Sequence, residues 1–429
     1  MNTLQISVIA AAVVLAVTAL LIFAGILPGF RPTSPDESGE ISFWGTLPAE
    51  SVRLLISDFG QRFKSIKVNY REVPEDAYMA ELLNALASGT GPDVFILPQE
   101  QILKHKDKIY ALDSSAYPVR AFKDNFFASS EIFIRPEGII GLPFQIDPLV
   151  LYWNRDLFRN AGLAKTPSTW DEFSETSNKL KTVQGQKIIT AGSALGEFSN
   201  NQNAKDILAL LILQTGNKIV DPETLKPVFG ERGAVLSPAE EALLFFMSFS
   251  DPRKETYTWS KSQPEALEAF ASGRLAMHIG YATEIEKILA LNPHLNFDVS
   301  EAPQINGSKT QGTFGRTSAL VVAKQSQNRA AALTFIYDLT SPGEQNILAQ
   351  NSYSAPALRS VFAAAQKDPV LEVFYKSAVK SLSWLDPDPE QTKAVWKEMT
   401  ESALSGAKRI NQAVSDAQRK FEALIPREN

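Results

Sequence analysis

The sequence contains no cysteine and only three histidines among its 429 residues. The lack of cysteine excludes disulfides, thiol catalysis, cysteine-bound metals and attachment through an acylated cysteine. His105, His278 and His294 are scattered without the spacing of a metal site, so we expect neither a metal nor a cofactor. A Gly-x-x-x-x-Gly-Lys phosphate loop and a Gly-x-Ser-x-Gly nucleophile elbow are also missing. The sequence shows no internal repeat of fixed period, which excludes solenoids and propellers.

The sequence has no block of positive charge either. Its 42 lysines and arginines are outnumbered by 48 aspartates and glutamates, which gives a net charge of -6. Because binding to nucleic-acid phosphates needs clustered lysine and arginine, we expect no nucleic-acid partner. The length and the apolar content of 44% instead predict a large core, divided between two lobes.

The N-terminal region contains a long apolar run. Residues 6–26 include only two polar side chains, Ser7 and Thr18. At about 1.5 Å per residue, a helix of this length crosses a hydrocarbon layer of about 30 Å. A cleaved signal peptide is the alternative, but its apolar region is shorter and follows lysine or arginine. We therefore predict a transmembrane anchor, or a signal, over residues 1–27 and an extended linker over residues 28–40. The charges that flank the apolar run do not fix the orientation of the anchor in the membrane.

Strand and helix patterns alternate after the linker. Strands are predicted at 41–44, 66–70 and 94–97, and helices at 52–63 and 75–86, from the spacing of apolar residues. This βαβαβ order predicts a mostly parallel sheet that binds ligands beyond the carboxyl ends of its strands. Further strands are predicted at 149–153, 188–189, 274–279 and 319–322, and further helices at 264–271, 328–339, from Pro389 onward, and at 410–424.

The most informative segment is residues 141–173, GLPFQIDPLVLYWNRDLFRNAGLAKTPSTWDEF. Its continuous apolar run at 149–153 is typical of a buried strand. Asn154 then opens a short helical turn, which Gly162 ends in a left-handed conformation. Thr169 and Glu172 have the spacing of a capping box, in which each satisfies a free backbone donor, so a second helix is predicted there.

The order and identity of these residues resemble the extracellular solute-binding proteins of ABC importers, in the family of the maltose-binding and other sugar-binding proteins. The segments 89–94 and 270–277 resemble the same family, and the resemblance extends from about residue 41 to the final helix. It implies an α/β fold of the two-lobed, type II periplasmic-binding-protein kind, with the ligand in a cleft between the lobes.

The resemblance also implies that each lobe is built from two stretches of chain. The first lobe would contain residues 41–146 plus 304–342, and the second lobe residues 147–303 plus 343–429. The chain would cross between the lobes near 145–147, 300–304 and 341–343. Such short connections form a hinge on which two rigid lobes close.

Sugar recognition needs flat aromatic faces and hydrogen-bonding side chains that meet in a cleft. Trp44, Tyr281 and Trp384 are the expected aromatic contacts, each with core packing as the alternative. Asp147 is expected to accept a hydrogen bond from a sugar hydroxyl, or else to bind backbone groups of the hinge. The full set of ligand-binding candidates is Trp44, Gln99, Glu100, Gln145, Asp147, Tyr281, Phe314 and Trp384, with Arg316, Glu197, Asn200 and Asn201 as weaker ones.

The function implied by the resemblance is that of a monomeric, extracytoplasmic receptor. It would capture a carbohydrate by lobe closure and deliver it to the permease of an ABC importer. Two alternatives remain open: the same fold could bind a peptide or polyamine, or act as an anchored sensor. A glycoside-processing enzyme is a further alternative, because Asp147, Glu100 or Glu197 could supply the two carboxylates, about 5–9.5 Å apart, that such chemistry needs.

Overall fold

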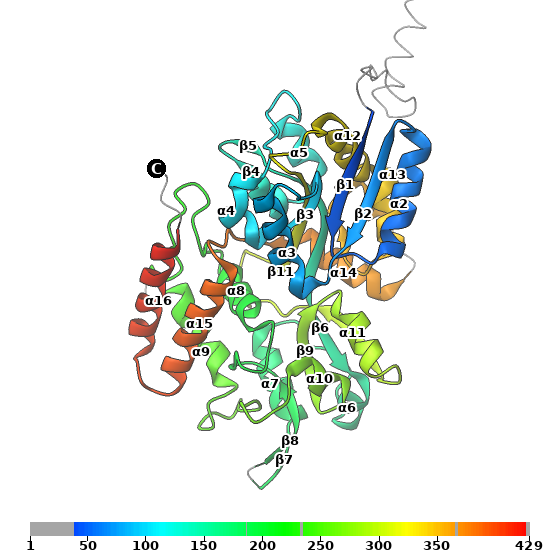
Figure 1. Cartoon of the computed structure of the whole chain (residues 1–429). Helices are drawn as coiled ribbons and strands as arrows, with labels where there is room; N and C mark the ends of the chain where they lie inside the picture. Colours follow the sequence, from blue (N-terminus) through cyan, green and yellow to red (C-terminus); the bar gives the residue numbers. More distant parts are fainter. Residues whose placement is uncertain (1–37, 186, 232–234, 365–367, 426–429) are drawn as a thin grey trace, which may run out of the picture.

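The computed structural model describes residues 38–425 apart from 186, 232–234 and 365–367. Figure 1 shows two α/β lobes, with strand β6 (Leu142–Asn154) extending from one into the other. This arrangement confirms the two-lobed fold that the sequence predicted.

The first lobe is the part that contains β1 to β3 and the helices around them. Its elements are β1 Gly39–Gly45, α2 Ala49–Arg62, β2 Ile66–Glu72, α3 Glu75–Ser88, β3 Val94–Pro98, η1 Gln99–Gln101, α4 Ile102–His105, η2 Lys106–Lys108, α5 Val119–Asn125, η3 Ala128–Phe133, β4 Ile134–Arg135, β5 Gly138–Ile139, β11 Thr313–Val322, α12 Arg329–Leu339 and α13 Pro342–Gln350.

The second lobe begins after β6, and the C-terminal helices also belong to it. Its elements are α6 Arg155–Asn160, α7 Trp170–Leu180, β7 Thr182–Gln184, β8 Lys187–Ser193, α8 Ala204–Gln214, α9 Pro238–Ser248, α10 Ala266–Ala271, β9 Leu275–Tyr281, α11 Glu284–Leu291, β10 Phe297–Glu301, α15 Pro389–Leu404 and α16 Ile410–Leu424. Short elements near the junction are β12 Ala355–Pro356, η4 Arg359–Ala364, α14 Pro369–Val379 and β13 Ser381–Leu382.

The main sheet passes through both lobes in the order β2-β1-β3-β11-β6-β9-β8-β7. The predicted βαβαβ unit is present, and β2, β1 and β3 are parallel. The prediction of a mostly parallel sheet was wrong, because β11 is antiparallel to both β3 and β6, and β6 is antiparallel to β9. The chain returns to the first lobe through β11, which runs against its neighbours, so the sheet is mixed.

Strand β6 is shared by two hydrophobic cores. Its first part pairs with β11, and residues 149–153 pair with β9. Leu149 and Leu151 belong to one buried cluster, whereas Val150 and Tyr152 belong to the other. Because successive side chains of a strand point to opposite faces, one strand contributes to both cores.

The caps predicted around β6 are largely present. The Asn154 side chain accepts hydrogen bonds from the backbone N–H groups of the first turn of α6, and Gly162 has a φ of 68°. Thr169 caps α7 by accepting from the Glu172 N–H at 3.2 Å. The reciprocal half of the capping box differs from the prediction, since the Glu172 carboxylate accepts from the Ser168 N–H at 2.7 Å and not from that of Thr169.

Contacts near the predicted lobe crossings show which elements the connecting segments pack against. Residues 303–312 lie against α8, because the Gln214 amide donates to the carbonyls of Pro303 at 2.9 Å and Gly312 at 2.7 Å. Helix α13 packs against α2 of the first lobe. The boundaries 41–146 plus 304–342 and 147–303 plus 343–429 stay a prediction.

The predicted anchor, linker start and N-terminus lie outside the described residues. Within the part of the chain that the structure does describe, none of the helices has the length and apolar character needed to span a membrane. The anchor over residues 6–26 therefore stays a prediction.

Candidate functional site: the cleft between the lobes

Two adjoining cavities lie between the lobes. The first, which we call the cleft cavity, has a volume of about 560 Å³. It is lined by Glu75, Asp76, Gln99, Glu100, Gln202, Asn203, Lys205, Asp206, Thr283, Glu284, Lys287, Phe314, Arg316, Trp384, Asp386, Pro389 and Lys393.

The second, which we call the hinge cavity, has a volume of about 470 Å³ and reaches Gln145, Asp147 and Ser354 beside the hinge strands. Six residues line both cavities, so the two spaces share a wall. These residues are Glu75, Asp76, Glu100, Thr283, Lys287 and Arg316.

Four helices begin at the cleft cavity: α3, α8, α11 and α15. A helix N-terminus carries about half a positive charge on its free N–H groups. The lining side chains comprise six carboxylates and four cationic groups. With the four helix ends included, the charges of the lining nearly cancel, and the surface is rich in hydrogen-bonding groups.

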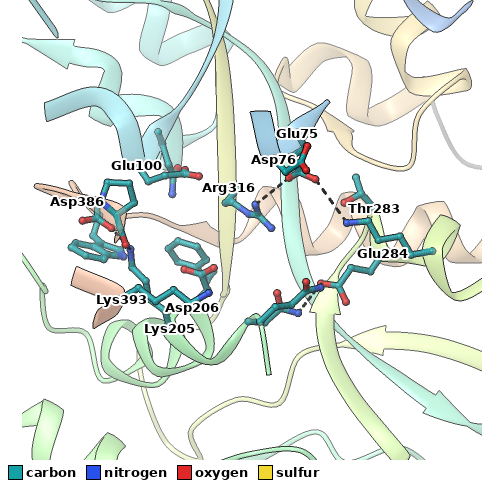
Figure 2. Close-up of a pocket in the computed structure, with 17 residues that line it drawn as sticks. Glu75, Asp76, Glu100, Lys205, Asp206, Thr283, Glu284, Arg316, Asp386 and Lys393 are labelled. Carbon is teal, nitrogen blue, oxygen red and sulfur yellow. Dashed lines mark hydrogen bonds and ion pairs between the residues drawn. The ribbon is translucent and has the colours of Figure 1, made fainter. Parts of the chain in front are cut away.

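Arg316 occupies the middle of this site. Its side chain extends from β11 into the cavity, as Figure 2 shows. The guanidinium carbon lies 3.6 Å from the centroid of the Tyr281 ring of the second lobe, and one nitrogen lies 3.9 Å from a Glu75 oxygen. Glu75 also lies 3.8 Å from Lys287 of α11. These contacts join the two lobes across the shared wall.

Three of the lining charges are held firmly by their surroundings. Lys205 and Asp386 form a buried ion pair, and the Lys205 ammonium also donates to the Pro389 carbonyl at 3.1 Å. Glu284 lies against His278, with 2.7 Å between Oε2 and Nε2, and its other oxygen accepts from Asn203 at 2.7 Å. Burial raises the pKa of Glu284, but the interactions with His278, the hydrogen bond from Asn203 and a backbone hydrogen bond together outweigh burial, so the pKa is lowered.

Glu100 differs from these paired groups. Its Oε2 atom is buried and has no hydrogen-bond partner. Burial raises the pKa of Glu100, and the positive charge of Arg316 opposes this rise. Asp206, by contrast, accepts a hydrogen bond of 2.7 Å from the Tyr281 hydroxyl. Glu100 therefore keeps one enclosed carboxylate oxygen without a hydrogen-bond partner.

Four predicted site residues line the cleft cavity: Gln99, Glu100, Phe314 and Trp384. Gln99 is buried, and its Oε1 accepts from the Thr317 N–H at 3.0 Å. Trp384 is mostly buried against the ring of Trp396, at 5.7 Å between centroids. Phe314 lies inside β11, which begins at Thr313 and so extends further toward the N-terminus than the strand predicted at 319–322.

Gln145 and Asp147 line the hinge cavity instead. Gln145 accepts from the Ser354 hydroxyl at 3.2 Å. The Asp147 carboxylate accepts from the Thr283 N–H at 3.2 Å and from its hydroxyl at 2.6 Å. Burial raises the pKa of Asp147 to about 6. Asp147 thus connects β6 to the start of α11, which is the alternative role expected for it.

The remaining predicted aromatic residues do not present open faces to the cleft cavity. Trp44, at the end of β1, is outside the lining of both cavities and has the Arg71 guanidinium 4.2 Å from its ring centroid. Tyr281 is buried beneath Arg316. The weaker candidates Glu197, Asn200 and Asn201 are buried and lie outside the lining of both cavities.

The sequence did not single out the residues at the helix starts. Glu75, Asp206 and Glu284 each stand in the first turn of a helix. Acidic residues are common there because they complement the helix dipole, so this pattern is typical of helix starts and does not by itself indicate a site. The convergence of four helix starts depends on the fold, and no local signal in the sequence reveals it.

Two α/β lobes joined by shared strands, with a polar cavity between them, define a binding protein that encloses a solute. The model of the bacterial extracellular solute-binding protein family matches residues 45–346. The chain belongs to this family, which confirms the resemblance found in residues 141–173.

Several relatives have related sequences or folds. A putative binding protein of Brucella abortus is 23% identical over 330 residues, which cover 72% of this chain and 74% of the relative. The diacetylchitobiose binding protein of Streptomyces coelicolor is 24% identical over 294 residues, or 68% of this chain and 66% of that protein. The solved cyclic α-maltosyl-1,6-maltose binding protein of Arthrobacter globiformis has a TM-score of 0.76 at 16% identity, covering 90% and 99% of the two chains. At that identity, the structural likeness shows the fold alone.

Proposed function

We propose that this protein captures a carbohydrate, in particular an oligosaccharide, between its lobes and delivers it to an ABC importer. The observation that carries this proposal is the cleft cavity, whose lining is nearly balanced in charge and densely polar. A neutral solute with many hydroxyl groups suits such a lining, because it supplies donors and acceptors without adding uncompensated charge. The saccharides in the names of two relatives support the same class of ligand.

The protein acts as a receptor whose lobes close on the solute. Cross-lobe ion pairs stand on two sides of the cavity: Glu75 with Lys287 at 3.8 Å, and Lys104 with Asp388 at 3.0 Å. A solute that contacts both lobes binds the closed form better than the open form and so shifts the population toward closure. The permease then recognises the closed shape.

The binding domain operates outside the cytoplasm as a monomer, held at the membrane by residues 6–26. Support for this location comes from the extracellular family and from the apolar run of that segment. Comparing membrane and soluble fractions of cells that express the full chain, with and without residues 1–27, tests the anchor. Release of the full chain into the soluble fraction would contradict it.

Thermal-shift measurements over neutral oligosaccharides, peptides and polyamines test the ligand class. A ligand at 100 times its Kd stabilises the folded protein by about 2.7 kcal/mol, which is readily measured. We expect a neutral oligosaccharide to raise the melting temperature and chromatography to recover it unchanged. A shift caused only by peptides or polyamines would remove the carbohydrate assignment, and cleavage of the bound sugar would favour the enzyme alternative.

A further inference from the structure

A separate cavity, which we call the end groove, lies on the first lobe away from the cleft. Its volume of about 930 Å³ exceeds that of either cavity between the lobes. Helices α5 and α12 border it. Figure 1 shows both helices at the end of the first lobe that lies away from the second lobe. A solute held between the lobes therefore does not account for this groove.

The lining of the end groove is aromatic and uncharged. None of the described side chains that line it carries a charge, although 21% of the residues of the chain are charged. The rings of Tyr117 and Tyr337 stack in its wall, with 6.0 Å between their centroids and 24° between their planes. Phe63 and Leu333 add apolar surface, and all four side chains are only partly buried. Such a surface suits an uncharged, apolar partner, because burying a charge against it is costly.

The chain enters the first lobe beside the end groove. The Gly39 N–H donates to the Ser65 carbonyl at 3.1 Å, two residues after Phe63 in the groove wall. The Asn328 side chain, at the N-cap of α12, donates to the Glu40 carbonyl at 3.1 Å. The residues before Gly39 are therefore tethered next to two walls of the groove, which gives them a high effective concentration there.

The sequence before Gly39 has the composition that an aromatic groove binds. Residues 27–35 read LPGFRPTSP, with Pro32 and Pro35 three positions apart. A polyproline II helix has three residues per turn, so these two rings share one side of it. Aromatic-lined grooves bind Pro-x-x-Pro segments because the extended conformation is already formed and little entropy is lost.

The reach of this segment matches the position of the stacked rings. Pro35 precedes Glu40 by five residues, which span about 15 Å in a polyproline II helix. Tyr337 follows Asn328 by nine residues, which span about 14 Å along α12. Because Glu40 and Asn328 are hydrogen-bonded to each other, the two distances start from the same place.

We propose that the linker over residues 28–37 lies in the end groove, with Pro32 and Pro35 against the ring pair of Tyr117 and Tyr337. The linker then fixes the direction in which the first lobe is held relative to residues 1–27 and leaves the cleft open to solutes. This inference depends neither on the class of ligand nor on whether residues 6–26 span a membrane.

Disulfide cross-linking of the full chain tests the proposal. The chain has no cysteine, so two introduced cysteines are its only thiols. Ser34→Cys is combined with Thr334→Cys in the groove wall or, as a control, with Leu54→Cys on α2. Leu54 is 47% exposed and stands eleven residues before Ser65, at a comparable distance from the chain entry.

We expect the disulfide to Thr334→Cys to form about tenfold faster than the disulfide to Leu54→Cys, because docking places the first pair of thiols together. Non-reducing electrophoresis measures both rates. Equal rates would mean that the linker samples both faces freely and would overturn the proposal. Disulfide-linked dimers through Thr334→Cys would overturn it too, because a second copy of the chain would then occupy the groove.

Replacing the two prolines shows whether their rings hold the linker in place. In the chain with Ser34→Cys and Thr334→Cys, we expect Pro32→Ala with Pro35→Ala to slow disulfide formation about tenfold. Thr33→Ala is the matched control, and we expect a change of less than about twofold, because Thr33 lies on another side of the polyproline helix. An unchanged rate in the double proline variant would overturn the assignment.

The mobility of a nitroxide attached to Ser34→Cys gives a second measurement that needs no cross-link. We expect an immobilised spectrum on the nanosecond timescale, because the linker is held by the groove. Thr334→Asp, which places a charge in the uncharged lining, should make the label mobile, whereas Leu54→Asp should not. A label that is already mobile with the groove unaltered would overturn the proposal.

Discussion

The buried ion pair between Lys205 and Asp386 allows a quantitative prediction. The two side chains are 9% and 3% exposed. Asp386→Asn would leave the Lys205 ammonium without a carboxylate partner, with the Pro389 carbonyl at 3.1 Å, the Trp384 ring centroid at 5.5 Å and the neutral Asn amide as its neighbours. Removing one partner of a buried pair destabilises a protein by about 3–5 kcal/mol. Because Lys205 borders the cleft cavity, where water can enter, we expect the lower end, about 3 kcal/mol.

Urea denaturation followed by circular dichroism measures this loss, provided that the m-value is unchanged. Lys218→Met is the surface control, because Lys218 and its partner Asp221 are 56% and 23% exposed. Exposed pairs contribute less than about 1 kcal/mol. Adding Lys205→Met to Asp386→Asn should restore more than half of the lost stability by removing the unpaired charge. A cost for Asp386→Asn as small as that of the surface control would refute the reasoning.

Two further predictions concern the hinge region. Burial raises the pKa of Asp147 to about 6, above its unfolded value of about 3.9, so the folded protein retains a proton that the unfolded chain has released. Its contribution to stability therefore falls as the pH rises from about 4 to 6. Asp147→Asn should remove that part of the pH dependence of the melting temperature. Plots of melting temperature against pH that run parallel for the two proteins would contradict this. In Gly280→Ala, the added Cβ would lie 2.4 Å from Glu284 Oε2 and 2.6 Å from His278 Nε2, which forces their hydrogen bond apart. We expect the free energy of unfolding, measured by urea denaturation, to fall by about 1–3 kcal/mol. Gly60→Ala is the control and should lose no stability, because its added Cβ meets nothing within 4 Å. Equal stability of the two variants would count against the close packing at Gly280.

Local patterns predicted the elements of this fold well. Apolar alternation located β1, a continuous apolar run located β3, and the side chains of Asn154 and Thr169 cap the helices where the sequence placed them. Such features depend on neighbours within a few residues, which the sequence displays directly. The direction of strand pairing depends on how the chain returns, so β11 was not recognised as antiparallel to β3.

The cleft was predicted less completely than the fold. Glu100 followed a strand, and residues after strands commonly face a ligand, so it could be found from the sequence. The contact between Arg316 and Tyr281 joins residues 35 positions apart through the geometry of β11 and β9, and only the structure reveals it. Arg316 and the acidic helix starts were therefore underrated as parts of the site.

The shared strand β6 limits how the hinge can change in evolution. Leu149 and Leu151 face one core, whereas Val150 and Tyr152 face the other. Inserting a single residue before Leu149 would reverse this alternation and exchange the side chains offered to the two cores. A single added residue is therefore tolerated in β6 only where a bulge absorbs it, as at the existing register shift between Pro143 and Gln145, so the order of side chains from Leu149 onward constrains the length of the hinge.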